Sequence, residues 1–317
     1  MLLKHADDKS NRVELLERLL RSGGLSVNQM DWLRQELDRL RKGIQGERDA
    51  AHYLDNYLGD GKNWALIHDL RLVFEGEVAQ IDHLIINRLA NVFLLETKNF
   101  NGNLRITAAG EFSVKYGQRE FGIPSPLEQS RRHERVLSKL LTRLEILPRV
   151  GRQFEFHHLV LVDPKATISR PSPKVLDTSM VIKADQFPAW HEKFADREPG
   201  LVEAFKGLAN LRSAETVREW GEKLLRQHRP ADLLSLPEFI QPTGVGSTAA
   251  DAMKSAALSR PPQGSVAPSP AARAAPRTLV CAQCGGKISF AEGKFCWNNE
   301  RRFGGLQYCR EHQALFK

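Results

Sequence analysis

Two carboxylates and a lysine lie in stretches that otherwise have the composition of buried β-strands. Asp82 interrupts the apolar stretch 78–86, and Glu96 and Lys98 end the next one along the chain. Because side chains two residues apart on a strand point to the same face, about 6.6 Å apart, Glu96 and Lys98 should project together. A charge inside a sheet is costly unless it is paired or binds a metal ion. If the two strands pair, we therefore expect Asp82, Glu96 and Lys98 to meet around a cation.

The chemistry that needs such a set is phosphodiester hydrolysis. Two carboxylates a few ångströms apart repel each other by about 4 kcal/mol at an effective dielectric constant of about 20, and a divalent cation removes this penalty. Oxygen ligands suit Mg²⁺ or Mn²⁺, which would polarise a phosphate and acidify a bound water. Lys98 would position that water or stabilise developing charge. His83 should face the other side of the sheet and serve packing, because it follows Asp82 directly.

The four cysteines gather near the carboxyl end of the chain. Cys281 and Cys284 form one pair, Cys309 and His312 form another, and 24 residues separate the two pairs. Pairs of this spacing are typical of tetrahedral zinc sites, and a module this small needs a metal to fold. We therefore expect a structural Zn²⁺ held by these four residues, with Cys296 either a buried small apolar residue or the substitute for His312.

Helices are expected before the first strand. Residues 11–21 have a helical pattern with Asn11 as the N-cap of a capping box. A second helix begins at Ser26, which also starts a capping box. Gly43 and Gly46 are expected to break or bend this helix before it continues to about residue 58.

The pattern then changes to that of strands. Strands are predicted over 64–72, 78–86, 92–97 and 158–162, with weaker ones over 103–107 and 111–116. Ser125 as N-cap and Pro126 at the first helical position open a helix over 126–152. Its many arginines and lysines are either simply solvated or hold a DNA backbone. This order of elements predicts an α/β fold with a mixed sheet flanked by helices.

Four sequence blocks carry a resemblance to a known family. They are Gly46-Glu47, Gln80-Ile81-Asp82-His83, Glu96-Thr97-Lys98-Asn99 and Pro126-Leu127-Glu128-Gln129. Together they resemble the nuclease-related domain, NERD, of the PD-(D/E)XK nuclease-like fold. The resemblance implies Asp82 and Glu96 as metal ligands and Lys98 as the catalytic lysine. It also implies Glu47 as a further acidic residue at the metal and Gln129 as a polar residue of the catalytic site.

The predicted organisation has five segments. They are an N-terminal helical segment over 1–42, the NERD nuclease-like domain over 43–165, a mainly helical extension over 166–240, a flexible linker rich in Pro, Ala and Ser over 241–278, and a zinc ribbon over 279–317. The last segment resembles zinc ribbons appended to NERD and DNA-processing proteins. Four residues of this segment could contact nucleic acid by charge and stacking: Trp297, Arg301, Arg302 and Phe303. Alternatively, the two aromatic residues fill the core of the ribbon.

Composition limits the functional classes. The chain of 317 residues has a formal net charge of +8, which favours a polyanionic partner such as DNA. No stretch is apolar enough to span a membrane, and without a signal-peptide pattern we expect a cytoplasmic protein. The chain contains neither the glycine-rich loops of nucleotide binding nor the nucleophile elbow of α/β-hydrolases. We therefore expect a Mg²⁺- or Mn²⁺-dependent DNA nuclease, or alternatively an inactive nucleic-acid-binding or scaffold protein with the same fold. A homo-oligomer is compatible with either.

Overall fold

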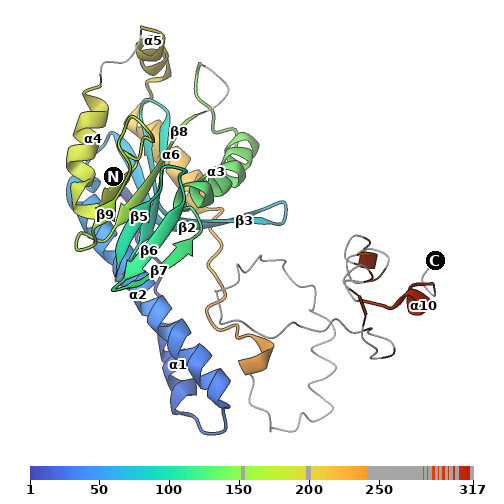
Figure 1. Ribbon diagram of the computed structural model, residues 1–317. Helices are drawn as coiled ribbons and strands as arrows, with labels where there is room; N and C mark the ends of the chain where they lie inside the picture. Colours follow the sequence, from blue (N-terminus) through green and yellow to red (C-terminus); the bar gives the residue numbers. More distant parts are fainter. Residues whose placement is uncertain are drawn as a thin grey trace. The chain divides into compact units, whose positions relative to one another are not determined.

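The computed structural model (Figure 1) describes residues 1–100, 102–150, 154–197 and 201–240, together with parts of the C-terminal module between 281 and 314. The chain forms two compact units, Met1–Leu258 and Ser259–Lys317. The predicted linker over 241–278 and the residues Trp297, Arg301 and Arg302 lie outside the described residues.

Two helices precede the long strands of the main sheet, and the second of them contains the Gly46-Glu47 block. They are α1 (Ser10–Arg21) and α2 (Val27–Leu58). The capping box that starts at Ser26 is confirmed, because the Ser26 side chain accepts from the backbone N–H of Gln29 and the Gln29 side chain accepts from that of Ser26. The predicted capping box at Asn11 is wrong. Asp8 accepts from the Ser10 backbone N–H over 2.8 Å, so the chain turns into α1 earlier and Asn11 lies inside the helix.

The predicted break in α2 is also wrong, since the helix runs without interruption past Gly43 and Gly46. Gly46 serves a close approach instead. A Cβ added at Gly46 would lie 2.5 Å from Cβ of Asn99, which follows β4, whereas one added at Gly43 would meet open space. The glycine at position 46 therefore lets α2 lie directly against the end of the central sheet.

The main sheet is mixed, as predicted. Its strands, in spatial order, are β1 (Leu2–Lys4), β2 (Trp64–Phe74), β3 (Glu77–Asn87), β4 (Asn91–Lys98), β8 (Glu155–Val162) and β10 (Val181–Lys183). The β2–β3 and β3–β4 pairs are antiparallel, and the β1–β2, β4–β8 and β8–β10 pairs are parallel. β1 and β10 are strands that the sequence did not indicate, because three residues are too few to show a period of two.

A smaller sheet covers part of the main one. Its order is β7 (Arg119–Ile123), β6 (Phe112–Tyr116), β5 (Asn103–Ile106) and β9 (Ile168–Ser169). The predicted strands over 103–107 and 111–116 are confirmed, and β7 is an additional strand. Apolar side chains of β5 and β6 pack on Val160 and Val162 of β8. The small sheet is thereby fixed on one face of the main sheet.

Helices cover the remaining surface of the sheet (Figure 1). α2 and α4 (Phe187–Ala195) pack on one face, against Phe93 and Leu95 of β4. α3 (Pro126–Arg143) and α6 (Ala214–Leu225) pack on the other face, against Leu94. The alternation along β4 therefore directs Glu96 and Lys98 to the face of α3. The remaining helical elements are η1 (Ala184–Gln186), α5 (Leu201–Asn210), η2 (Glu238–Ile240) and α10 (Arg310–Gln313).

The N-cap of α3 is confirmed, and its length is shorter than expected. The Ser125 side chain accepts from the backbone N–H of Glu128, and Pro126 opens the helix. The helix ends at Arg143 instead of continuing to 152, because Glu145 has a φ of 56°, which a helix does not accommodate. The C-terminal part of the predicted basic surface is therefore not helical.

Candidate active site

Three carboxylates lie in one row across β2, β3 and β4. The β2–β3 register sets Asp69 opposite Asp82, and the β3–β4 register, continued by one residue, sets Asp82 opposite Glu96. Asp69 and Glu96 are buried, and Asp82 is partly buried. Sequence reasoning anticipated Asp82 and Glu96 on adjacent strands. It missed Asp69, although the same signal, a carboxylate within an apolar strand, is present there.

Glu96 lies at the centre of a closed group of polar side chains. One carboxylate oxygen, Oε1, accepts from Nζ of Lys98 over 2.7 Å and from Nε2 of Gln129 over 2.6 Å. Lys98 also donates to Oε1 of Gln129 over 3.2 Å. His133, one turn further along α3, has Nδ1 3.8 Å from the other oxygen of Glu96. The end of β4 and the beginning of α3 therefore bring together Glu96, Lys98 and Gln129, as the sequence blocks suggested.

Asp82 is held by the backbone of the neighbouring strand. Its Oδ2 accepts from the backbone N–H of Thr97 over 2.7 Å. Burial raises the pKa of Asp82 well above its usual value, and the charges of Glu96 and Glu47 raise it further. Burial also raises the pKa of Glu96, although Lys98 opposes this, and it raises the pKa of Glu47 against the influence of Lys9. Such carboxylates need an additional positive charge to remain ionised together.

Glu47 approaches the same row from α2. Its Oε2 lies 2.7 Å from Nζ of Lys9, and the same ammonium lies 3.2 Å from Oδ2 of Asp69. The other oxygen of Asp69 accepts from Nε2 of Gln80 over 3.0 Å. Asp69 has a φ of 49°, which is uncommon for a residue other than glycine and is typical of functional sites. Lys9 and Asp69 thus extend the site beyond the residues that the sequence predicted.

The donor set fits a hard divalent cation. All its candidate ligands are carboxylate oxygens, and burial raises the pKa of each of these carboxyl groups. Among the described residues, however, these carboxylates do not form a group of three or more side chains that could hold a metal ion. Lys98 pairs with Glu96, and Lys9 pairs with Glu47. Asp82 and Glu96, which lie opposite each other on adjacent strands, are the candidate ligands.

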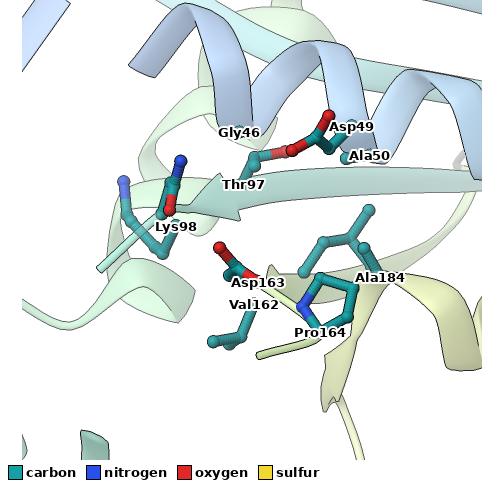
Figure 2. Close-up of a pocket in the computed structure, with 11 residues that line it drawn as sticks. Gly46, Asp49, Ala50, Thr97, Lys98, Val162, Asp163, Pro164 and Ala184 are labelled. Carbon is teal, nitrogen blue, oxygen red and sulfur yellow. The ribbon is translucent and has the colours of Figure 1, made fainter. Parts of the chain in front are cut away.

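A small pocket lies beside this site without containing its carboxylates (Figure 2). It is formed by the end of β4, the adjoining turn of α2 and the residues after β8, including Thr97, Lys98, Asn99, Asp49, Asp163 and Pro164. Oδ1 of Asn99 is buried and has no hydrogen-bond partner among the described residues, while Nδ2 donates to the backbone oxygen of Lys42. The pocket borders Lys98, but Asp82 and Glu96 do not line it.

A chain of buried histidines supports the site from the opposite face of the sheet. Nε2 of His68 lies 2.9 Å from Oδ1 of Asp55, and the two histidines, His68 and His83, contact through their Nδ1 atoms at 2.7 Å. Nε2 of His83 then lies 3.0 Å from Oγ1 of Thr97. Burial lowers the pKa of His68 and, more strongly, that of His83, so both rings are neutral at pH 7. His83 is packed on the face away from Asp82, and it holds the residue whose backbone N–H binds Asp82.

The C-terminal module gathers one set of metal-ligating atoms. One ligand atom from each of Cys281, Cys284, Cys309 and His312 lies within 4.8 Å of all the others. Sγ of Cys309 is 3.1 Å from Nδ1 of His312. Cys296 lies outside this group. It is buried, and its Sγ accepts from the backbone N–H of Tyr308 over 3.3 Å. The geometry therefore favours His312 over Cys296 as the fourth ligand of a zinc-binding module.

Phe303 packs in the core of this module. Its side chain is buried together with Ile288, Cys296 and Tyr308. Of the four residues considered for nucleic-acid contact in this module, Phe303 is the one within the described residues, and its burial fits the packing role.

The fold and the site define an α/β protein with a nuclease-like mixed sheet. Residues 42–162 match the family model of the nuclease-related domain, NERD. This match indicates a nuclease-related function. No curated protein and no solved structure matches the chain. Among the described residues, no helix is both long enough and apolar enough to cross a membrane.

Proposed function

We propose that this protein is a Mg²⁺- or Mn²⁺-dependent nuclease that hydrolyses phosphodiester bonds of DNA. The observation that carries the proposal is the pairing of Asp82 and Glu96 on adjacent strands, on one face of the sheet, with Nζ of Lys98 2.7 Å from Glu96. Buried carboxylates with raised pKa values beside a lysine are an arrangement typical of sites for chemistry. The NERD match supports the same reaction class.

The roles of the residues follow from their contacts. A bound Mg²⁺ or Mn²⁺ would supply Lewis acidity towards a phosphate oxygen and would lower the pKa of a water ligand. Asp82 and Glu96 would hold the ion, whereas Glu47, the third ligand expected from the sequence, pairs with Lys9. The Thr97 backbone N–H fixes the orientation of Asp82. Lys98 would orient the attacking water and stabilise negative charge on the phosphate, and it is held for this role by Glu96 and Gln129.

The exposed side of α3 offers a surface for the DNA backbone. The first turn of the helix lies beside the site, where Gln129 contacts Glu96, and the helix carries exposed basic residues along its length: Arg131, Arg132, Arg135, Lys139 and Arg143. Arg131 forms an ion pair with Glu128, and Lys139 forms one with Glu77, which reduces the contribution of both residues to DNA binding. Contacts of this type bind phosphates without sequence preference and weaken as salt increases. A structural Zn²⁺ at the Cys₃His cluster would stabilise the C-terminal module.

The test is cleavage of supercoiled plasmid DNA by the full-length protein with Mg²⁺ or Mn²⁺. Asp82→Asn and Glu96→Gln should abolish cleavage, and Lys98→Met should lower its rate by about 10²-fold or more. Glu219→Gln, an exposed position on α6, is the matched control and should cleave like the wild type. If the wild type and all three site variants behave alike, the catalytic proposal is wrong.

One observation favours a second function, that of a non-catalytic DNA-binding protein. Lys98 and Lys9 already pair with Glu96 and Glu47, so part of the charge that a metal ion would neutralise is neutralised within the chain. This alternative predicts DNA binding in EDTA that Glu96→Gln leaves unchanged, with no cleavage in either metal. The nuclease proposal instead predicts cleavage that requires the metal and is lost in Glu96→Gln.

A further inference from the structure

Lys9 lies outside the NERD match, yet its ammonium reaches the carboxylate row. The side chain is 13 % exposed, and its Nζ bridges Glu47 and Asp69 at 2.7 and 3.2 Å. The ammonium group therefore lies between two carboxylates that would otherwise suit a metal ion.

The segment that carries Lys9 is held in place. The backbone N–H of Asp7 donates to Oδ2 of Asp69 over 3.3 Å, and the Asp7 carboxylate lies 2.9 Å from Nε2 of His228, beyond the end of α6. On the other side of Lys9, Asp8 turns the chain into α1 by accepting from Ser10. Contacts on both sides fix the segment, so Lys9 is not a freely moving surface lysine.

A count of charges indicates how many metal ions the site can accept. Four carboxylates converge there, those of Glu47, Asp69, Asp82 and Glu96, and two ammonium groups lie among them, those of Lys9 and Lys98. With all groups ionised, two negative charges remain, which one divalent ion neutralises. A second divalent ion would leave the buried cluster with two positive charges, which is unfavourable where solvent is largely excluded.

We propose that Lys9 is a built-in cation that takes the place of a second metal ion, so that the site binds a single divalent ion through Asp82 and Glu96. Glu47, the third ligand expected from the sequence, then forms an ion pair with Lys9 instead of binding the metal ion. Asp69 pairs with the same lysine. This inference rests on the proposed metal-dependent function, but it concerns how many ions bind and not whether DNA is cleaved.

The experiment counts bound Mn²⁺ by electron paramagnetic resonance in the zinc-loaded full-length protein. The wild type should bind one ion and lose it in Glu96→Gln. Lys9→Met should bind two, because Glu47 and Asp69 become available, whereas the charge-retaining Lys9→Arg should still bind one. Lys62→Met, at an exposed position, is the control and should also bind one. Circular dichroism establishes that each variant is folded.

Each possible number of bound Mn²⁺ ions either supports or overturns the inference. Two ions in the wild type, or none, would overturn the inference without reference to any variant, so the test holds even if Lys9→Met does not fold. A folded Lys9→Met that binds one ion would overturn it too, since Lys9 would then be only a structural ion-pair partner. A change from one ion to two in a protein that does not cleave DNA would uphold the inference while refuting the nuclease function.

Discussion

The most direct test of how the site is supported is to replace Thr97 by valine. Oδ1 of Asp55 accepts a hydrogen bond from Nε2 of His68, so Nδ1 of the neutral His68 ring is an acceptor. His83 then donates from Nδ1, and its Nε2 accepts from the Thr97 hydroxyl. Each ring is thus confined to one tautomer, and the chain ends on a hydroxyl that valine lacks.

The magnitude follows from the burial of His83, whose side chain is 1 % exposed. Thr97→Val leaves Nε2 of His83 without its donor, and an unsatisfied buried acceptor costs about 1–3 kcal/mol. For a folded unit of this size each kcal/mol lowers the melting temperature by about 2–4 °C, so a decrease of about 2–12 °C is expected. The backbone N–H of Thr97 still donates to Asp82 in the variant. The decrease in melting temperature therefore reports the loss of the Thr97 hydroxyl and not the loss of the contact with Asp82.

Thermal unfolding followed by circular dichroism at pH 7.5 is the assay. Thr97→Ser keeps the hydroxyl and is the matched control, with a melting temperature close to that of the wild type. If the valine and serine variants melt together, the hydrogen bond from Thr97 to His83 contributes nothing to stability. The histidine chain would then not hold Thr97 in place.

Three further outcomes are expected. Gly46→Ala places a Cβ 2.5 Å from Cβ of Asn99 and should destabilise the fold by about 1–3 kcal/mol in urea unfolding, whereas Gly43→Ala, in open space, should not. Burial lowers the pKa of His157 to about 4 against a usual 6.5, so unfolding takes up a proton below pH 6.5. Between pH 6.5 and 4, the free energy of unfolding of the wild type should therefore decrease by up to about 3 kcal/mol more than that of His157→Gln. Equal decreases for the two proteins in urea unfolding would contradict this. Removal of zinc by a chelator should unfold the C-terminal module and leave the melting temperature of the larger unit unchanged; a joint shift in calorimetry would argue against a separate zinc-stabilised module.

Much of the local structure could be predicted because its causes are local. The capping box at Ser26, the N-cap at Ser125 and the central strands follow from neighbouring side chains and from the period of two. The errors have local causes too. Asp8 accepts from the Ser10 backbone N–H, so α1 begins before Asn11. The sequence around Gly46 does not show that Asn99, after β4, packs where a side chain at position 46 would lie.

The candidate site divides in the same way. Asp82, Glu96 and Lys98 stand out in the sequence because a charge in an apolar strand is costly without a partner, and that cost is visible from composition alone. Their grouping with Gln129 depends on α3 returning beside β4, which the order of the sequence blocks already indicated.

What the sequence determined by itself is which side chains need charge compensation, since carboxylates within apolar strands are costly without a positive partner. Only the tertiary structure decided where that compensation comes from. Lys9 and Glu47 are 38 residues apart, and Lys9 and Asp69 are 60 apart, so their contacts arise from the way β1 and the segment after it lie along β2. No periodicity or cap encodes a contact over that distance, because it is set by the packing of whole elements.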